Sequence, residues 1–120
     1  MTDITIYHNP RCSKSRETLA IVERFAGEHG VRLHVVDYQR TPPTLAQLQE
    51  IRAQLDVPAK EMVRDNEEEF AALGLRDAGD DALLAAVARH PQLLQRPIVV
   101  YRGRAAIGRP PERIRGLLEA

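Results

Sequence analysis

The order strand, helix, strand within residues 3–37 constrains the fold more than any other feature of this chain. Residues 3–7 alternate apolar and polar side chains, and residues 13–26 carry apolar side chains at helical spacing. Residues 31–37 then predict a second strand, which we expect to be mostly buried. Two strands joined through a helix run parallel with a right-handed crossover. The chain therefore begins with a βαβ unit.

The middle of the chain is predicted to be entirely helical. Thr44 and Gln47 form a capping box at the start of the first of these helices. Asp80 or Asp81 is expected to cap the last one. The expected helices cover residues 45–55, 57–63, 67–73 and 82–90.

Strand signals return near the C-terminus. Residues 97–101 are an apolar run, Arg102-Gly103 is a tight-turn signal, and residues 104–107 complete a hairpin. A last helix is expected over residues 112–118. The chain is thus predicted to be one α/β domain over residues 1–120, with a four-stranded mixed sheet and a helical insertion at about 44–90.

Composition excludes several classes of partner. The 120 residues include 17 basic and 17 acidic side chains, which gives no strong electrostatic case for nucleic acid or an anionic membrane. No apolar run approaches the ~20 residues of a membrane-spanning helix. One cysteine cannot form an internal disulfide, which favours a reducing cytoplasmic location. No metal-ligand spacing is visible, so we expect no metal site.

That single cysteine, Cys12, lies at the turn between the first strand and the first helix. Free backbone N–H groups and the positive end of the helix dipole favour an anion there, and a thiolate is such an anion. His8, Arg11, Lys14 and Arg16 surround it in sequence. Many lone cysteines are inert core residues, but these polar neighbours make a poor core. We therefore expect a reactive thiol with a lowered pKa.

Three other chemistries fail on the sequence. A Cys-x5-Arg phosphatase loop would need arginine at position 18, where Thr18 stands. Ser15 occupies the second position of a Cys-x-x-Cys pair, which excludes an internal dithiol cycle. The phosphate-binding loops Gly-x4-Gly-Lys and Gly-x-Gly-x-x-Gly are both absent.

The element order, with a cysteine at the first turn, resembles the thioredoxin-like fold. Five segments narrow the resemblance to the glutaredoxin-dependent arsenate reductase family, the ArsC family. They are His8-Asn9-Pro10-Arg11-Cys12-Ser13-Lys14-Ser15-Arg16, Arg64-Asp65-Asn66, Leu73-Gly74-Leu75, Arg96-Pro97-Ile98-Val99-Val100 and Gly108-Arg109-Pro110.

The resemblance implies a mechanism in which Cys12 attacks arsenate. Glutathione, a co-substrate and not a bound cofactor, would then add to the adduct. Glutaredoxin would resolve the mixed species and release arsenite. A single-cysteine enzyme must obtain its second thiol from a partner, because exchange needs another attacking thiolate.

The resemblance also implies an oxyanion site made of Arg64, Arg96 and Arg109. Guanidinium groups bind tetrahedral oxyanions through paired hydrogen bonds and keep their charge when partly desolvated. The alternative for each arginine is an ordinary surface salt bridge.

Other residues are expected to support the thiol. The resemblance implies that His8 lowers the pKa of Cys12 and that Pro97 is cis and faces the cysteine. Asn9 either holds the loop or only begins its turn. Ser15 either donates a hydrogen bond to the thiolate or is an ordinary first-turn residue. The role of Arg16 stays open between the site and a solvated charge.

Two alternative functions stay open. Spx-type regulators, which bind RNA polymerase and sense oxidation, share a similar fold, but many of them carry a Cys-x-x-Cys switch that Ser15 rules out here. A thiol oxidoreductase of the same fold with another substrate is the second alternative.

Overall fold

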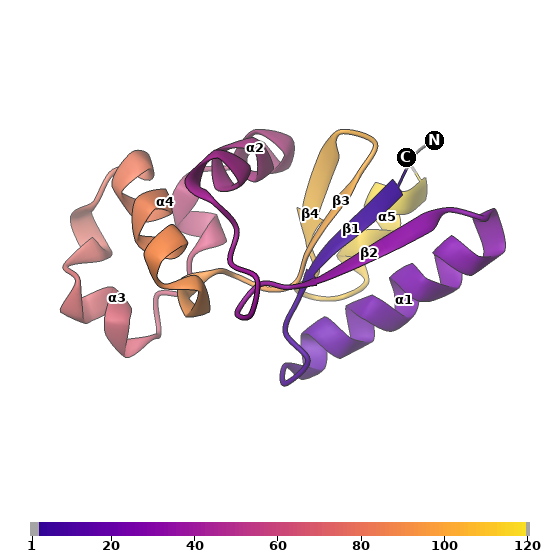
Figure 1. Cartoon of the computed structure of the whole chain (residues 1–120), viewed down its shortest axis with the longest axis horizontal. Helices are drawn as coiled ribbons and strands as arrows, with labels where there is room; N and C mark the ends of the chain where they lie inside the picture. The colour runs from indigo at the N-terminus through magenta and orange to yellow at the C-terminus, as the bar shows by residue number, and fades with distance from the viewer. Residues whose placement is uncertain (1–2, 120) are drawn as a thin grey trace. The chain divides into compact units, whose positions relative to one another are not determined.

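The computed structural model describes residues 3–119, in which the strands and helices follow one another in the predicted order (Figure 1). Residues up to Thr41 and from Arg96 onward form one compact unit, and Pro42–Gln95 forms a second. The first unit contains β1 (Asp3–His8), α1 (Ser13–His29), β2 (Arg32–Asp37), β3 (Ile98–Tyr101), β4 (Arg104–Ile107) and α5 (Arg113–Glu119). The second contains α2 (Leu45–Leu55), α3 (Glu68–Ala72), α4 (Asp80–Arg89) and the short 3-10 helices Ala59–Met62, Leu75–Asp77 and Pro91–Leu93.

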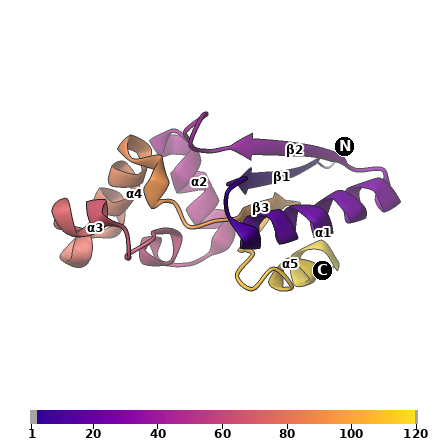
Figure 2. The ribbon, with the colours of Figure 1, turned by 90° about the horizontal axis from the view of Figure 1, so that it is seen from below.

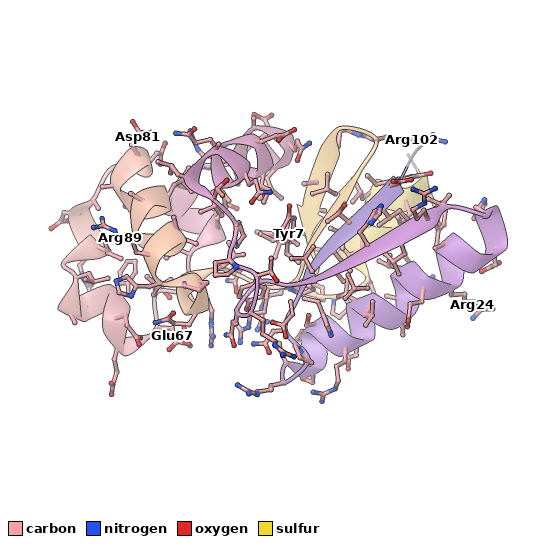
Figure 3. All side chains as sticks on the ribbon, in the orientation of Figure 1. Tyr7, Arg24, Glu67, Asp81, Arg89 and Arg102 are labelled. Carbon is pink, nitrogen blue, oxygen red and sulfur yellow. The ribbon has the colours of Figure 1, made fainter. Side chains whose placement is uncertain are left out.

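The four strands of the first unit form one mixed sheet in the order β2-β1-β3-β4. β1 runs parallel to β2, pairs antiparallel with β3, and β3 pairs antiparallel with β4. This confirms the predicted α/β fold with a parallel first half and an antiparallel second half. The β3–β4 turn places Arg102 at φ 53° and Gly103 at φ 74°, the left-handed pair that two-residue hairpin turns need (Figure 3).

The core of the first unit lies between the sheet and two helices. Ile4 and Ile6 of β1 are completely buried, and α1 and α5 cover the face onto which they project (Figure 2). The other buried members of this cluster are Val22, Ala26, Val99, Tyr101, Ile114, Leu117 and Leu118. This packing fixes α1 against the sheet, and with it the turn that precedes α1.

β2 departs from its prediction as a mostly buried strand. It is an edge strand with a neighbour on one side only, and Val35 is 49% exposed. The apolar residues of β2 resemble those of a central strand, but its position at the sheet edge leaves them half covered.

α1 is longer than predicted because Gly27 continues the helix. The chain leaves the helix at Gly30, whose φ of 64° is left-handed and whose N–H donates to the Ala26 carbonyl. A glycine at this position closes the helix without a steric penalty.

The second unit is a helical cluster with its own buried side chains, including Leu48, Met62 and Leu83. The capping box of Thr44 and Gln47 is present as predicted. The predicted acidic cap of α4 is wrong. Gly79 is the N-cap residue, while the Asp80 carboxylate accepts from Arg52 Nη2 at 2.6 Å and from the Ala59 N–H at 3.1 Å.

The second unit is slightly longer than the insertion expected at about 44–90. That residues 1–120 act as a single domain stays a prediction.

Candidate active site

Cys12 is the N-cap residue of α1, with extended backbone angles of φ −100° and ψ 123°. Its N–H donates to the Asn9 carbonyl at 3.0 Å, and the Asn9 Oδ1 accepts from the Arg11 N–H at 3.0 Å. Arg16 Nη1 donates to the Pro10 carbonyl at 3.0 Å. Asn9 and Arg16 therefore hold the loop that carries the thiol.

The thiol is partly exposed and has a cationic neighbour from the far end of the chain. Arg109 Nη1 lies 3.8 Å from Cys12 Sγ. The same nitrogen donates to the Arg96 carbonyl at 3.2 Å, which links the segment before β3 to the segment after β4. The structure thus brings Arg109 to the thiol, as the resemblance implied.

The pKa of Cys12 is lowered. Burial of the thiol raises its pKa, but hydrogen bonds and positive charge outweigh that effect. The contributing groups are the backbone N–H of Ser15, the charge of Arg96, the guanidinium of Arg109 and the backbone N–H of Lys14. A helix N-terminus and two arginines are the surroundings that activate a thiol as a nucleophile.

Pro97 directly follows Arg96 and is buried. The Arg96–Pro97 peptide bond is cis, as the resemblance implied, and so is the Arg109–Pro110 bond. The Pro97 carbonyl accepts from the Gly108 N–H at 2.9 Å. The two segments that carry Arg96 and Arg109 are therefore bonded to each other through their backbones.

His8 contacts Ser15. Its Nδ1 lies 2.6 Å from the Ser15 Oγ, and this oxygen accepts a hydrogen bond from the Asn9 N–H at 3.0 Å. Ser15 is completely buried. Its hydroxyl bonds His8 and the Asn9 N–H, while its backbone N–H donates a hydrogen bond to the thiol. The ring of His8 contacts Ser15 and is not among the groups that shift the pKa of Cys12. That His8 lowers the pKa of Cys12 therefore stays a prediction.

The pKa of His8 is itself lowered. Burial is the main cause, the charge of Arg16 adds to it, and the carboxylates of Asp37 and Glu23 oppose it. A buried neutral imidazole can accept a hydrogen bond from the Ser15 hydroxyl.

Arg64 lies in the second unit. Its Nη1 pairs with Glu67 Oε1 at 2.6 Å, and both side chains are partly exposed, at 17% and 27%. Among residues 3–119 the Arg64 Nε, which is itself buried, has no hydrogen-bond partner. That Arg64 lies beside Cys12 stays a prediction. The sequence carries no signal for this pair, because residues 64–67 are not helical and the helical spacing rule does not apply to them.

Two features are absent from residues 3–119. None of the helices is long and apolar enough to cross a membrane. Within the same range, no group of three or more His, Cys, Asp and Glu side chains is arranged to hold a metal ion.

A sequence model of the ArsC family matches residues 7–117. This chain belongs to the ArsC family. An arsenate reductase of Neisseria meningitidis is 46% identical over 121 residues, which cover 98% of this chain and all of that protein. The uncharacterized Escherichia coli protein YfgD is 44% identical over 114 residues and 92% of each chain.

Solved structures support the same assignment. An arsenate reductase from Vibrio cholerae superposes with a TM-score of 0.86 at 44% identity, covering 96% of this chain and 97% of that one. The fold of this ArsC family member is therefore the thioredoxin-like fold of the arsenate reductases.

Proposed function

We propose that this ArsC family member is an arsenate reductase, with Cys12 as its nucleophile. The observation that carries the proposal is the Cys12 thiol at the N-terminus of α1, with the Arg109 guanidinium 3.8 Å from its sulfur. The named activities of the relatives from Neisseria meningitidis and Vibrio cholerae support it.

The first step joins the thiolate to arsenic. Cys12 Sγ attacks the arsenic of arsenate, an As–S bond forms, and one oxygen leaves as water after it is protonated. Both reactants are negative, so cations at the site reduce their repulsion. Arg109 and Arg96 supply that charge beside the thiol, and Arg64 is proposed to add a third guanidinium.

The reduction then takes two electrons from two thiols. A glutathione thiol displaces a second oxygen of the adduct as water, which gives a mixed Cys12–arsenic(V)–glutathione species. A glutaredoxin thiolate then attacks the glutathione sulfur: the bond between that sulfur and arsenic breaks, its electron pair stays on arsenic, arsenic(V) becomes arsenic(III), and a glutaredoxin–glutathione disulfide forms. Water releases arsenite from Cys12, which returns to the thiol. We place this cycle in the cytoplasm, where glutathione keeps thiols reduced.

Arsenite formation tests the proposal directly. The complete mixture contains arsenate, glutathione and glutaredoxin, and each component is then omitted in turn. We expect arsenite only from the complete mixture and none from the Cys12→Ser variant. Full activity without glutaredoxin would contradict the proposed reductant. An absence of arsenite, with a thiol that still reacts with iodoacetamide, would instead favour a thiol oxidoreductase with another substrate.

A further inference from the structure

Arg109 reaches the thiol from a position 97 residues away in the sequence. It lies outside regular structure, after β4 ends at Ile107 and before α5 begins at Arg113. A guanidinium on such a segment approaches one particular atom only if something fixes its backbone. The neighbouring residue, Gly108, provides that fixed point.

Gly108 is buried against two side chains of the first unit. A Cβ atom at this position would lie 2.5 Å from Thr18 Oγ1, 3.0 Å from Thr18 Cγ2 and 2.9 Å from Pro97 Cγ. Its φ lies outside the left-handed region, so glycine is required for space and not for conformation. No larger residue fits between Thr18 and Pro97 without displacing one of them.

Thr18 is completely buried and lies on α1, the helix whose N-terminus carries Cys12. Its hydroxyl donates to the Lys14 carbonyl at 2.9 Å and lies 3.5 Å from the Gly108 carbonyl oxygen. One helix therefore holds the cysteine at its N-cap and packs against the Arg109 segment through its second turn.

We propose that Thr18 and Gly108 are positioning residues that set the approach of Arg109 to Cys12. This gives Thr18 a role at the position where a Cys-x5-Arg loop would carry its arginine. Here the arginine comes from a distant segment, and the residue at position 18 packs against that segment. The inference rests on the proposed function only in taking the Cys12 thiol as the reacting group.

The test measures the midpoint of iodoacetamide alkylation of Cys12 against pH, which needs no arsenate. We expect Gly108→Ala to raise this midpoint by about half to one pH unit, the scale of one weakened hydrogen bond to a charged group. Gly116→Ala is the matched control, because a Cβ there meets nothing within 4 Å; its midpoint should equal that of the wild type.

Two double variants separate positioning from general damage. Thr18→Ala removes two of the three close contacts that a Cβ at position 108 would make and leaves only Pro97 Cγ, so Thr18→Ala/Gly108→Ala should return the midpoint toward the wild-type value. In an Arg109→Leu background, Gly108→Ala should add no further shift, because its effect acts through Arg109.

The outcomes are decisive even where Gly108→Ala alone does not fold. A folded Thr18→Ala/Gly108→Ala protein with a near-wild-type midpoint supports the proposal. A wild-type midpoint in folded Gly108→Ala, a double variant with no recovery, or an added shift in the Arg109→Leu background would each overturn it. If the variants show these shifts while the wild-type protein forms no arsenite, only the proposed function is contradicted.

Discussion

The hydroxyl of Ser15 holds two groups of the neighbouring loop, the His8 ring and the Asn9 N–H. All three residues are buried. Removing the hydroxyl would leave two buried polar groups without their partner, which costs the desolvation energy of each group. The rigidity of the loop around Cys12 therefore depends on a side chain that does not itself bond the sulfur.

Ser15→Ala is expected to lower the free energy of unfolding by about 1–3 kcal/mol, the cost of unsatisfied buried polar groups. Ser13→Ala is the control, since Ser13 is an exposed residue of the same helical turn and should change stability by less than about 0.5 kcal/mol. Urea denaturation measures both. Equal stability of the two variants would mean that the Ser15 hydroxyl contributes nothing.

His8 predicts a pH dependence of stability. Its pKa in the folded protein is lowered, mainly by burial, so below about pH 6.5 the unfolded chain binds more protons than the folded one. The free energy of unfolding should therefore fall as the pH drops through this value. Urea midpoints measured from about pH 7.5 to 5.5 report the slope.

His8→Gln should flatten that slope, because it removes the group whose pKa is lowered in the folded protein. An identical slope in wild type and His8→Gln would contradict the assignment to His8.

At the scale of single residues, the sequence predicted the reactive thiol but not the contacts that hold the segments around it. Cys12 could be recognised because its neighbours along the chain create its environment. The contact between His8 and Ser15 depends on how residues 9–12 turn, and the packing of Thr18 against Gly108 joins residues 90 positions apart. Neither contact has a local pattern that would reveal it.

Aspartate side chains lie at opposite ends of two helices, where the helix dipole acts on them with opposite sign. Asp56 ends α2 in the left-handed conformation, at φ 56°. Asp81 lies in the first turn of α4. A carboxylate is unfavourable at the negative C-terminal end of a helix dipole and favourable at the positive N-terminal end.

The same substitution should therefore have opposite effects at these two ends. Asp56→Asn is expected to raise the free energy of unfolding by about 0.3–1 kcal/mol, and Asp81→Asn to lower it by a similar amount. Asparagine also tolerates the left-handed conformation. Thermal melts at low ionic strength measure the two changes. Shifts of the same sign would show that the helix dipole does not control stability at these ends.

Element existence followed from periodicity, whereas element boundaries and exposure did not. Gly27 and Gly30 are equally good stop signals in the sequence, and only Gly30 takes the left-handed angle. Asp80 has the composition of a helix cap, but its carboxylate bonds Arg52 and the Ala59 N–H. β2 is exposed because it lies at the edge of the sheet. The sequence of one strand does not show whether that strand will be central or at an edge.

At the scale of the whole molecule, the three arginines of the predicted oxyanion site belong to two different units. Arg96 and Arg109 belong to the unit of the thiol, and Arg64 belongs to the helical unit, where Glu67 already holds one of its nitrogens. An oxyanion bound by Arg64 would compete with that carboxylate for the same guanidinium.

The pair gives a test of the predicted role of Arg64. If Arg64 binds arsenate, Arg64→Ala should raise the KM for arsenate, and Glu67→Gln should lower it by about twofold to fivefold, the scale of a partly exposed ion pair. Glu68→Gln removes the same charge from an exposed neighbour and serves as the control. Steady-state kinetics decide the matter, and an unchanged KM in Arg64→Ala would assign Arg64 to a structural ion pair only.

The strand order has a consequence for how the protein is made. β1 is a central strand, but its two neighbours are synthesised far apart in time: β2 follows at once, and β3 begins only at Ile98. While the ribosome adds residues 42–95, one edge of β1 has no partner, and such an edge is a template for pairing with another chain. The helical unit, being contiguous, needs only its own residues to fold. A chain released before Ile98 would therefore contain all residues of the helical unit, but its sheet would consist of β2 and β1 only, with one edge of β1 unpaired.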